Sequence, residues 1–301
     1  MSQSIRTPWL YYLQREVQLT WLFIYRDLST TLLPGLVLVL LSWQDSGRSL
    51  ALLPLYLCGT LLHMGLSLYT FCLSNQVHSV EEDRLNKPDR PLPSGLICVR
   101  GMYRRQVVGN LLYLLVGVVL GVLWFTIAWQ VITYCLNNMG WSQHWATKNL
   151  LGMSLGAFVL DCAQWQIVQR LSSPVWLYIA TFCIWQGISF QVQDLRDQEG
   201  DRLLHRRTLP IVVGDPAARL MLGIHFCLFS PLLFLLVMYT NASLHELSGS
   251  VTGMCILVAE LLLNWLVAFR IWWYRHPAAD HKTYQVFTWL ACFNLLIIAF
   301  I

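Results

Sequence analysis

The sequence predicts an all-α integral membrane protein in which nine transmembrane helices form a single domain over residues 1–301. Composition is the first observation: 56% of the residues are hydrophobic and 12% are charged, whereas soluble proteins average about 25% charged residues. The second is a mean hydropathy of +0.53. The third is the recurrence of long apolar segments, with no linker, low-complexity tract or heptad array between them. These features exclude an ordinary water-soluble domain.

A helix that crosses a bilayer needs roughly 17 to 25 mainly apolar residues, and nine segments are of this length or close to it. They cover residues 18–43, 50–74, 104–121, 122–138, 148–168, 174–194, 216–239, 249–272 and 283–301. The apolar run from Val107 to Leu136 is too long for one upright helix, so we divide it near Gly121. A single tilted helix at this point would leave eight spans. The N-terminal segment, with Arg6 and Arg15, lacks the pattern of a cleavable signal peptide.

The distribution of basic residues predicts the orientation of these spans. Nearly all of the 20 Lys and Arg residues fall on the side of the N-terminus and of the loops after spans two, four, six and eight. Only Arg48 and Arg170 fall on the opposite side. Because cytoplasmic loops are enriched in basic residues, we expect this side to face the cytoplasm in a multi-pass protein of the endoplasmic reticulum. The net charge of +4 therefore indicates topology, and no nucleic-acid partner is expected.

The second span leads into a polar segment on this side, which we call the first motif. It reads Asn75-Gln-Val-His-Ser-Val-Glu-Glu-Asp83 and is followed by the segment Lys87-Pro-Asp-Arg-Pro-Leu-Pro-Ser-Gly95. On a helix, Asn75, Ser79 and Asp83 recur every four residues and therefore share one face. The prolines that follow block a helix, so we expect a stiff loop there that forms part of a lid.

The sixth span leads into the second motif, Asp194-Leu-Arg-Asp-Gln-Glu-Gly-Asp201. Asp194, Asp197 and Asp201 are spaced by three and four residues and again share a helical face. One such carboxylate is readily explained as a solvated loop charge, but two phased sets at matched helix ends indicate a common ligand. Oxygen-rich faces interleaved with Arg and Lys suit Mg²⁺ ions that bridge a diphosphate. A diphosphate with a hydrocarbon tail requires such a site beside a dry apolar cavity.

With these two motifs the sequence resembles the UbiA superfamily of intramembrane prenyltransferases, whose motifs are NDxxDxxxD and DxxDxxxD. The segments Lys87–Gly95 and Arg207–Ile211 also match the family pattern, and the resemblance extends over nearly the whole chain. It implies a UbiA-like bundle of nine transmembrane helices around a central cavity. It also implies Mg²⁺ as cofactor and a prenyl diphosphate as substrate, in contact with membrane lipid. No protein partner is indicated.

The resemblance implies roles for individual residues. The candidate metal ligands are Asn75, Asp83, Asp194, Asp197 and Asp201, and three of these, Asp83, Asp194 and Asp197, are the candidate catalytic residues. The candidate cations for binding the diphosphate of the substrate are Arg26, Arg84, Lys87, Arg90 and Lys148. Arg26 matches an arginine in the first helix of the family. The alternative for each of these cations is an anchor on the positive side of the membrane.

The first motif departs from the family pattern at two positions. Gln76 and Ser79 stand where family transferases usually have Asp, and Glu81 or Glu82 is the available replacement. The reduced pattern resembles a fungal branch that includes membrane-bound terpene cyclases. We therefore expect a Mg²⁺-dependent class I terpene cyclase that converts farnesyl or geranylgeranyl diphosphate to a cyclic terpene. The alternatives are a prenyltransferase that alkylates an aromatic or other acceptor, and a non-enzymatic transporter or scaffold.

Side chains within the spans are candidates for the interior of the cavity. Aromatic faces stabilise carbocations, and the aromatic residues expected to flank the cavity are Tyr69, Trp165, Trp185 and Phe190. Packing in the bundle core is the alternative for each of them. Asp161 falls toward the far end of its span and is either an interior or an interface residue. Glu260 and Asn264 lie one turn apart and are expected to form a structural hydrogen bond between helices.

Overall fold

The computed structural model describes residues 8–241 and 249–300. These residues form helices joined by short turns, and within them the only β-type pairing is an isolated bridge between His144 and Arg207. The α-helices are α1 (Pro8–Ile24), α2 (Leu28–Ser46), α3 (Leu53–His78), α4 (Val80–Asn86), α5 (Val99–Val119), α6 (Leu123–Asn137), α7 (Ser154–Val168), α8 (Ser173–Ser189), α9 (Gln198–Leu203), α10 (Leu209–Val213), α11 (Asp215–Ile224), α12 (Ser230–Asn241), α14 (Val251–Trp273) and α15 (Pro277–Leu295). Two π-helical segments, Ala146–Met153 and His225–Phe229, lead into α7 and α12. The 3₁₀ segments cover Leu50–Leu52, Trp141–Gln143, Phe190–Leu195 and Leu296–Phe300.

Seven helical segments in the described part of the chain are long and apolar enough to cross a membrane. They cover residues 28–46, 50–78, 146–168, 173–195, 215–236, 251–273 and 277–299. The third and fourth expected spans are present as α5 and α6, although α5 carries three arginines near its start and α6 has only 15 residues. The expected all-α membrane bundle is thus confirmed, and the described helices are compatible with nine spans.

The first expected span, residues 18–43, is interrupted in the structure. α1 ends at Ile24 and α2 begins at Leu28. The turn between them carries Arg26 and Asp27, which contact the charged side chains of Asp89 and Arg90. α1 leaves several large aromatic side chains exposed, and these are Trp9, Tyr11, Tyr12 and Trp21. This composition is typical of a helix at a membrane–water interface.

The turn at Gly121 confirms the division of the long apolar run into two helices. α5 ends at Val119 and α6 begins at Leu123, and Gly121 has a φ of +72°, which side-chain-bearing residues rarely adopt. The two helices then approach closely, because a Cβ atom at Gly117 would lie 2.4 Å from the Thr126 Oγ1 atom. Glycine therefore makes both the reversal and the contact possible.

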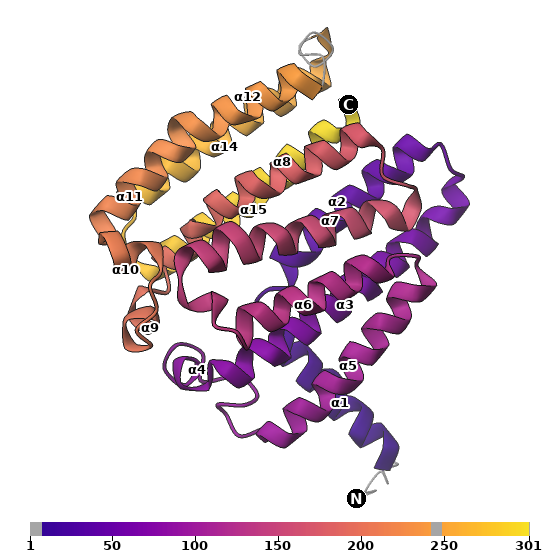
Figure 1. Ribbon diagram of the computed structural model, residues 1–301, viewed down its shortest axis with the longest axis vertical. Helices are drawn as coiled ribbons and strands as arrows, with labels where there is room; N and C mark the ends of the chain where they lie inside the picture. Colours follow the sequence, from indigo (N-terminus) through magenta and orange to yellow (C-terminus); the bar gives the residue numbers. More distant parts are fainter. Residues whose placement is uncertain (1–7, 242–248, 301) are drawn as a thin grey trace, which may run out of the picture.

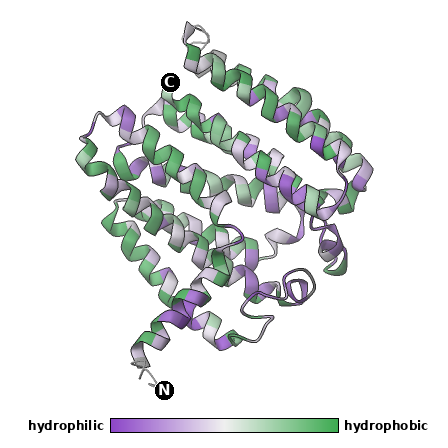
Figure 2. Cartoon of the chain, turned by 180° about the vertical axis from the view of Figure 1, so that it is seen from behind, coloured by the Kyte–Doolittle hydropathy of each residue, from purple (hydrophilic) through white to green (hydrophobic). Residues whose placement is uncertain are grey.

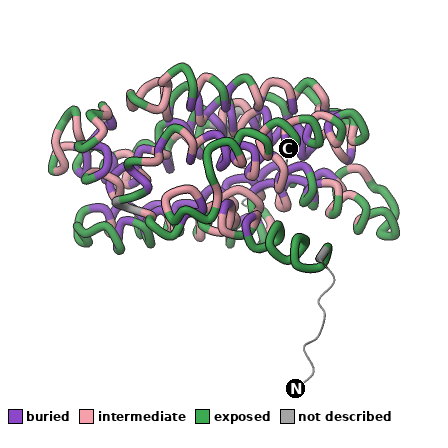
Figure 3. Tube along the Cα trace, turned by 90° about the horizontal axis from the view of Figure 1, so that it is seen from below, coloured by how far each residue is buried: buried purple, intermediate pink, exposed green. Residues whose placement is uncertain are grey.

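The helices pack in layers, with their buried residues between the layers and their exposed residues outside (Figure 3). α14 packs on α15, α2 on α7, and α3 on α5. α7 crosses the middle of the bundle, with α6 and α3 on one side and α8 and α15 on the other (Figure 1). Hydrophilic residues gather at the end of the bundle that holds the α4 and α9 loops (Figure 2). Helices from both halves of the sequence therefore meet beneath this polar end.

Candidate functional site

A cavity of about 250 Å³ lies among α2, α3, α6, α7 and α8. Its charged lining residues at the polar end are Asp27, Glu82, Lys87, Arg90, Lys148, Arg196, Asp197 and Arg206. Its large apolar and aromatic lining residues are Met64, Leu68, Phe71, Trp129, Leu136, Met153, Leu160, Phe190 and Tyr284. The cavity therefore joins a charged mouth to an apolar interior, which suits a ligand with an anionic head and a hydrocarbon tail.

The first motif is not one continuous helix. α3 ends at His78, Ser79 has a non-helical backbone (φ −119°, ψ 24°), and α4 begins after it. The Ser79 hydroxyl donates a hydrogen bond to the Asn75 carbonyl at 2.9 Å and lies 3.3 Å from Asp83 Oδ2. Asn75 and Ser79 line the cavity. Asp83, by contrast, is fully buried behind it.

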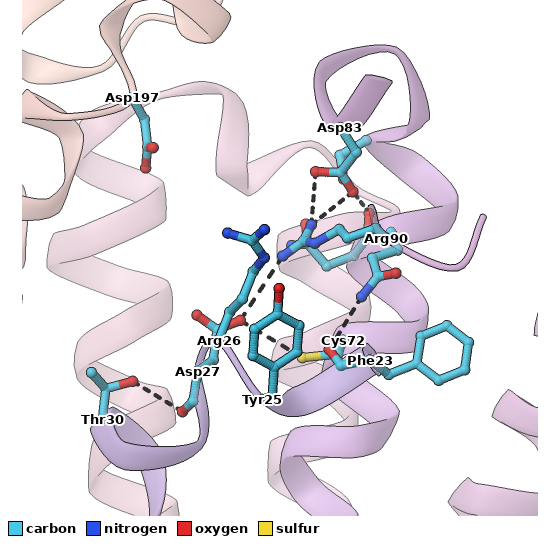
Figure 4. A network of polar contacts seen from close by, with 12 residues as sticks. Phe23, Tyr25, Arg26, Asp27, Thr30, Cys72, Asp83, Arg90 and Asp197 are labelled. Atoms are coloured by element: carbon cyan, nitrogen blue, oxygen red, sulfur yellow. Dashed lines mark hydrogen bonds and ion pairs between the residues drawn. The ribbon is translucent and has the colours of Figure 1, made fainter. Parts of the chain in front are cut away.

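Asp83 and Asp194 share one arrangement: each carboxylate is fully buried, and it contacts a basic side chain that lines the cavity. Arg90 donates two hydrogen bonds to Asp83, at 2.7 and 2.8 Å, as Figure 4 shows. Lys148 Nζ lies 2.5 Å from Asp194 Oδ1. Burial alone would lower the pKa of Arg90, but the charge of Asp83, its hydrogen bonds with Arg90 and the nearby charge of Asp27 together outweigh burial and raise that pKa. The cations thus separate the two carboxylates from the open space.

Asp201 is buried in the same way. Its Oδ2 atom accepts a hydrogen bond from Thr208 at 2.9 Å, and its Oδ1 atom lies 3.5 Å from Arg206 Nη1. Arg206 Nη1 also lies 2.8 Å from Glu82 Oε2. Glu82, one of the two available replacement carboxylates, therefore does line the cavity. Arg206 was not among the expected site residues, although it directly precedes the segment Arg207–Ile211 that matches the family pattern.

Asp197 differs from the other carboxylates because it lines the cavity itself. Its side chain keeps 24% exposure and accepts a hydrogen bond from Arg196 Nε at 3.2 Å. Burial alone would raise the pKa of Asp197, but the charges of Arg196, Lys87 and Lys148 outweigh it and lower that pKa. In Figure 4 the Asp197 side chain comes from another segment of the chain and stands apart from the Asp83–Arg90 pair. An ionised carboxylate thus faces the open space at the mouth.

The π-helical segment Ala146–Met153 brings two neighbouring residues to one carboxylate. Lys148 contacts Asp194 Oδ1, and the Asn149 amide donates to Asp194 Oδ2 at 2.9 Å. Adjacent residues of an α-helix point about 100° apart, whereas π-turns are wider and are frequent at functional sites. Asn149 is a further site residue that the sequence did not reveal, because the hydropathy pattern does not distinguish a π-turn from an α-turn.

Arg26 does not line the cavity and instead holds the loop after the first motif. Its Nη2 atom donates to both carboxylate oxygens of Asp89, at 2.7 and 2.9 Å, and the Tyr25 hydroxyl donates to the same carboxylate at 2.7 Å. Hydrogen bonds from Arg26 and then from Tyr25 lower the pKa of Asp89 to about 2. The adjacent Asp27 lines the cavity, 3.9 Å from Arg90. This turn therefore supplies a carboxylate to the mouth.

The last two candidate cations, Lys87 and Arg84, differ in whether they reach the cavity. Lys87 lines the cavity and makes no ion pair with any residue in the described ranges. Arg84 is exposed and pairs with the exposed Glu81 at 2.8 Å. The structure therefore does not bring Arg84 to the cavity, because it lies on the outer face of the short helix α4.

The candidate metal ligands surround the mouth without forming a ready-made cluster. Within the described residues, no three His, Cys, Asp or Glu side chains lie close enough together to hold a metal ion. Four of the five candidates each contact a basic side chain of the protein, and these four are Asp83, Asp194, Asp197 and Asp201. The fifth, Asn75, lines the cavity. The site therefore has hard oxygen donors whose charges are balanced from within the chain.

The aromatic residues that line the interior of the cavity differ from those expected from the sequence. Among the four expected, Phe190 lines the cavity. Trp165 and Trp185 are packed in the core instead, and Tyr69 lines a separate groove beside α5. Three aromatic residues that line the cavity were not expected, namely Phe71, Trp129 and Tyr284. Helix faces cannot be assigned from composition when every face of a span is apolar, and this explains the difference.

Two intramembrane polar positions are resolved by the structure. Asp161 is an interior residue, because it is only 4% exposed and lines the cavity. The expected contact of Glu260 with Asn264 is present, but both residues belong to α14 and the hydrogen bond does not join two helices.

The fold is shared with solved structures of low sequence identity. A UbiA homolog from Archaeoglobus fulgidus bound to GPP and Mg²⁺ is similar with a TM-score of 0.67 and 15% identity, covering 93% of this chain and 99% of that one. A structure of digeranylgeranylglyceryl phosphate synthase is similar with a TM-score of 0.63 and 16% identity, covering 94% and 97%.

Relatives of higher identity span almost the whole chain. Somaliensene A/B synthase of Streptomyces somaliensis is 34% identical, covering 93% of this chain and 90% of that protein. Diterpene cyclase eriG of Hericium erinaceus is 33% identical, covering 95% and 88%. Polyprenyl transferase eriF of the same fungus is 30% identical, covering 94% of each. Residues 31–291 match the sequence model of the UbiA prenyltransferase family, and the chain belongs to this family.

Proposed function

We propose that the protein is a Mg²⁺-dependent class I terpene cyclase that ionises farnesyl or geranylgeranyl diphosphate, closes the prenyl chain into a cyclic terpene and releases diphosphate. The observation that carries this proposal is the cavity, in which a cationic mouth adjoins an interior lined by aromatic rings. Two relatives at 33 and 34% identity are a terpene synthase and a diterpene cyclase by name. Family membership also argues against a non-enzymatic transporter or scaffold.

The donor set at the mouth fits Mg²⁺, which prefers oxygen ligands and usually keeps several waters. Asn75, Asp83, Asp194, Asp197 and Asp201 would hold it. When bound, Mg²⁺ neutralises the charge that develops on a departing diphosphate. The fit requires an exchange of partners, because four of the carboxylates contact protein cations. Once released from these carboxylates, the cations become available to the diphosphate.

The protein's own side chains would bind and orient the substrate. Lys87, Arg90 and Lys148 present their charges at the mouth, and charge-assisted hydrogen bonds to phosphate oxygens are among the stronger polar contacts. The Asn149 amide fixes the orientation of the Asp194 carboxylate. Deeper in the cavity, the faces of Phe71 and the other lining aromatics would stabilise allylic and later carbocations. The enclosed apolar walls would exclude water from these cations.

A prenyltransferase is the second candidate, because eriF, a polyprenyl transferase by name, is 30% identical over 94% of the chain. Both activities share the ionisation step. They differ in whether an external acceptor or an alkene of the same chain meets the cation. Ser79 in place of the usual Asp of the first motif supports the cyclase.

The decisive experiment uses membranes that contain the protein, Mg²⁺, and geranyl, farnesyl or geranylgeranyl diphosphate without any acceptor. The cyclase proposal expects a cyclic hydrocarbon or terpene alcohol, with diphosphate release that stops with EDTA. Asp194→Asn should abolish the product, whereas Glu81→Gln, on the exposed side of α4, should not. Products that form only with an aromatic acceptor would identify a transferase instead.

The cellular placement is a separate proposal. The multi-pass helices place the protein in a membrane, and we infer that its motif end faces the cytoplasm from the endoplasmic reticulum. The support is the excess of basic residues on the motif side. Cys98, exposed just before α5, offers a test: an impermeant thiol reagent should label it in intact microsomes oriented with their cytoplasmic face outward. Labelling only after permeabilisation would reverse the orientation.

A further inference from the structure

Asp161 lies deep in the cavity, far from the two motifs. It belongs to α7, thirteen positions beyond Lys148 at the mouth. At a rise of 1.5 Å per residue this is somewhat under 20 Å along the helix axis, since the π-helical start is more compact. Both residues line the same cavity. Asp161 is therefore placed at the end that the tail of a bound prenyl diphosphate would reach.

The Asp161 carboxylate has no charge partner in the described part of the chain. The contact that it receives comes from the Cys183 thiol, which lies 3.7 Å from Oδ2. Gln186 lines the same cavity, is only 4% exposed, and its Oε1 atom accepts no hydrogen bond from the described residues. The Asp161 carboxylate therefore borders the interior without a donor of matching strength among the described residues, and it would attract a positive charge there.

Burial of the Asp161 carboxylate is energetically unfavourable unless a cation or a strong hydrogen-bond donor balances its charge. An ionisable group inside a membrane bundle is unfavourable and usually marks a functional site with a partner. The carboxylates at the mouth contact Lys or Arg, and Glu260 elsewhere in the bundle contacts Asn264. Among residues 8–241 and 249–300, the polar contact of the Asp161 carboxylate is with a weakly polar thiol. The missing partner therefore belongs to the ligand.

We propose that Asp161 faces the carbocation at the tail end of the prenyl chain and accepts the proton that ends the cyclisation. This inference rests on the cyclase activity proposed above. In the final step a C–H bond next to the cationic carbon breaks, and its electron pair forms the new C=C bond. The proton passes to an Asp161 oxygen, so the charges of the cation and of the carboxylate are both neutralised.

The first test is Asp161→Asn, which keeps the size of the side chain and removes its charge. Ionisation takes place at the mouth, so diphosphate release should persist. The fraction of the wild-type product should fall at least tenfold, replaced by alcohols from water capture or by alkenes from deprotonation elsewhere. Glu260→Gln removes another buried intramembrane carboxyl outside the cavity and should leave the product distribution unchanged. An unchanged distribution in Asp161→Asn would overturn the proposal.

The second test measures binding and does not depend on turnover. Farnesyl dimethylamine, a cationic mimic, is titrated together with inorganic diphosphate into the purified protein, and farnesol serves as the uncharged control. Asp161→Asn should weaken binding of the ammonium at least tenfold and leave farnesol binding unchanged. Equal ammonium binding by both proteins contradicts a cation-facing role. If the ammonium difference is present but the wild type makes no terpene without an acceptor, the cyclase proposal fails while the cation-facing role of Asp161 stands.

Discussion

Arg206 Nη1 lies 2.8 Å from Glu82 Oε2, so a salt bridge joins the loop after the second motif to the helix of the first. The two side chains keep only 12 and 7% exposure. Arg206 also approaches Asp201 at 3.5 Å. One arginine therefore ties together carboxylates from both halves of the sequence at the mouth of the cavity.

Removal of either partner of this bridge should destabilise the protein. Arg206→Gln leaves Glu82 and Asp201 without their cation, and loss of one partner of a buried ion pair typically costs about 3–5 kcal/mol. The double variant Arg206→Gln with Glu82→Gln should be less destabilised than the sum of the single variants. Thermal unfolding in detergent measures all four proteins. Additive losses would show that the bridge is not energetically coupled.

Lys87 and Arg84, three residues apart, should respond differently to alanine. Lys87 lines the cavity, so Lys87→Ala should raise KM for the prenyl diphosphate roughly tenfold, as expected for one lost charge-assisted contact. Arg84→Ala removes only an exposed pair with Glu81, which should change stability by less than about 0.5 kcal/mol and leave KM unaltered. Steady-state kinetics separate the two. Equal changes in KM would place both cations on the substrate.

Ser79→Asp should tighten Mg²⁺ binding without changing the product. The Ser79 hydroxyl lies 3.3 Å from Asp83 Oδ2, so a carboxylate there would crowd a second negative charge beside Asp83, with Arg90 as its neighbouring cation. Without metal the variant should melt at a lower temperature than wild type. With substrate, half-maximal activity should need several-fold less Mg²⁺. Ser79→Asn, similar in size and uncharged, should show neither effect.

Asp197 should contribute stability that depends on pH in one direction. Its pKa is lowered in the folded protein from about 3.9 in an unfolded chain. The stabilisation is therefore complete above pH 4 to 5 and is lost as pH falls through the lowered folded value. The difference in melting temperature between wild type and Asp197→Asn should be constant from pH 8 to 5 and shrink below about 4. Shrinkage already between pH 7 and 5.5 would contradict a lowered pKa.

Hydropathy was sufficient to predict most of the bundle. A run of apolar residues has few alternatives to a spanning helix, and Gly121 marked the reversal between α5 and α6. The break between α1 and α2 was missed, because Arg26 and Asp27 occupy only one turn within an otherwise apolar segment. Two adjacent charges weigh little in a window the length of a membrane span.

The sequence predicted which types of residue form the candidate site better than it predicted the contacts between them. Spacing predicted one helical face for Asp194 and Asp197, but the 3₁₀ segment ends at Leu195 and α9 begins at Gln198, so no single helix carries both. Asp197 lines the cavity, whereas Asp194 is buried beneath Lys148. The cations that cover Asp83 and Asp201, and the backbone break at Ser79, depend on neighbours distant in sequence. Arg206 illustrates the limit: its partner Glu82 is more than a hundred residues away, and no periodicity links such positions.

The number of residues in the π-helical segment Ala146–Met153 determines the direction in which the side chains before α7 point. A π-turn holds more residues than an α-turn, so the residues before it are offset in angle from α7. Deleting one residue, such as the exposed Leu150, would restore an α-helical register and rotate the preceding residues by about 100° about the helix axis. Lys148 would then leave Asp194 although every site residue was still present. An insertion or deletion here would rotate the preceding residues about the helix axis, and would therefore change the direction of side chains that it does not replace.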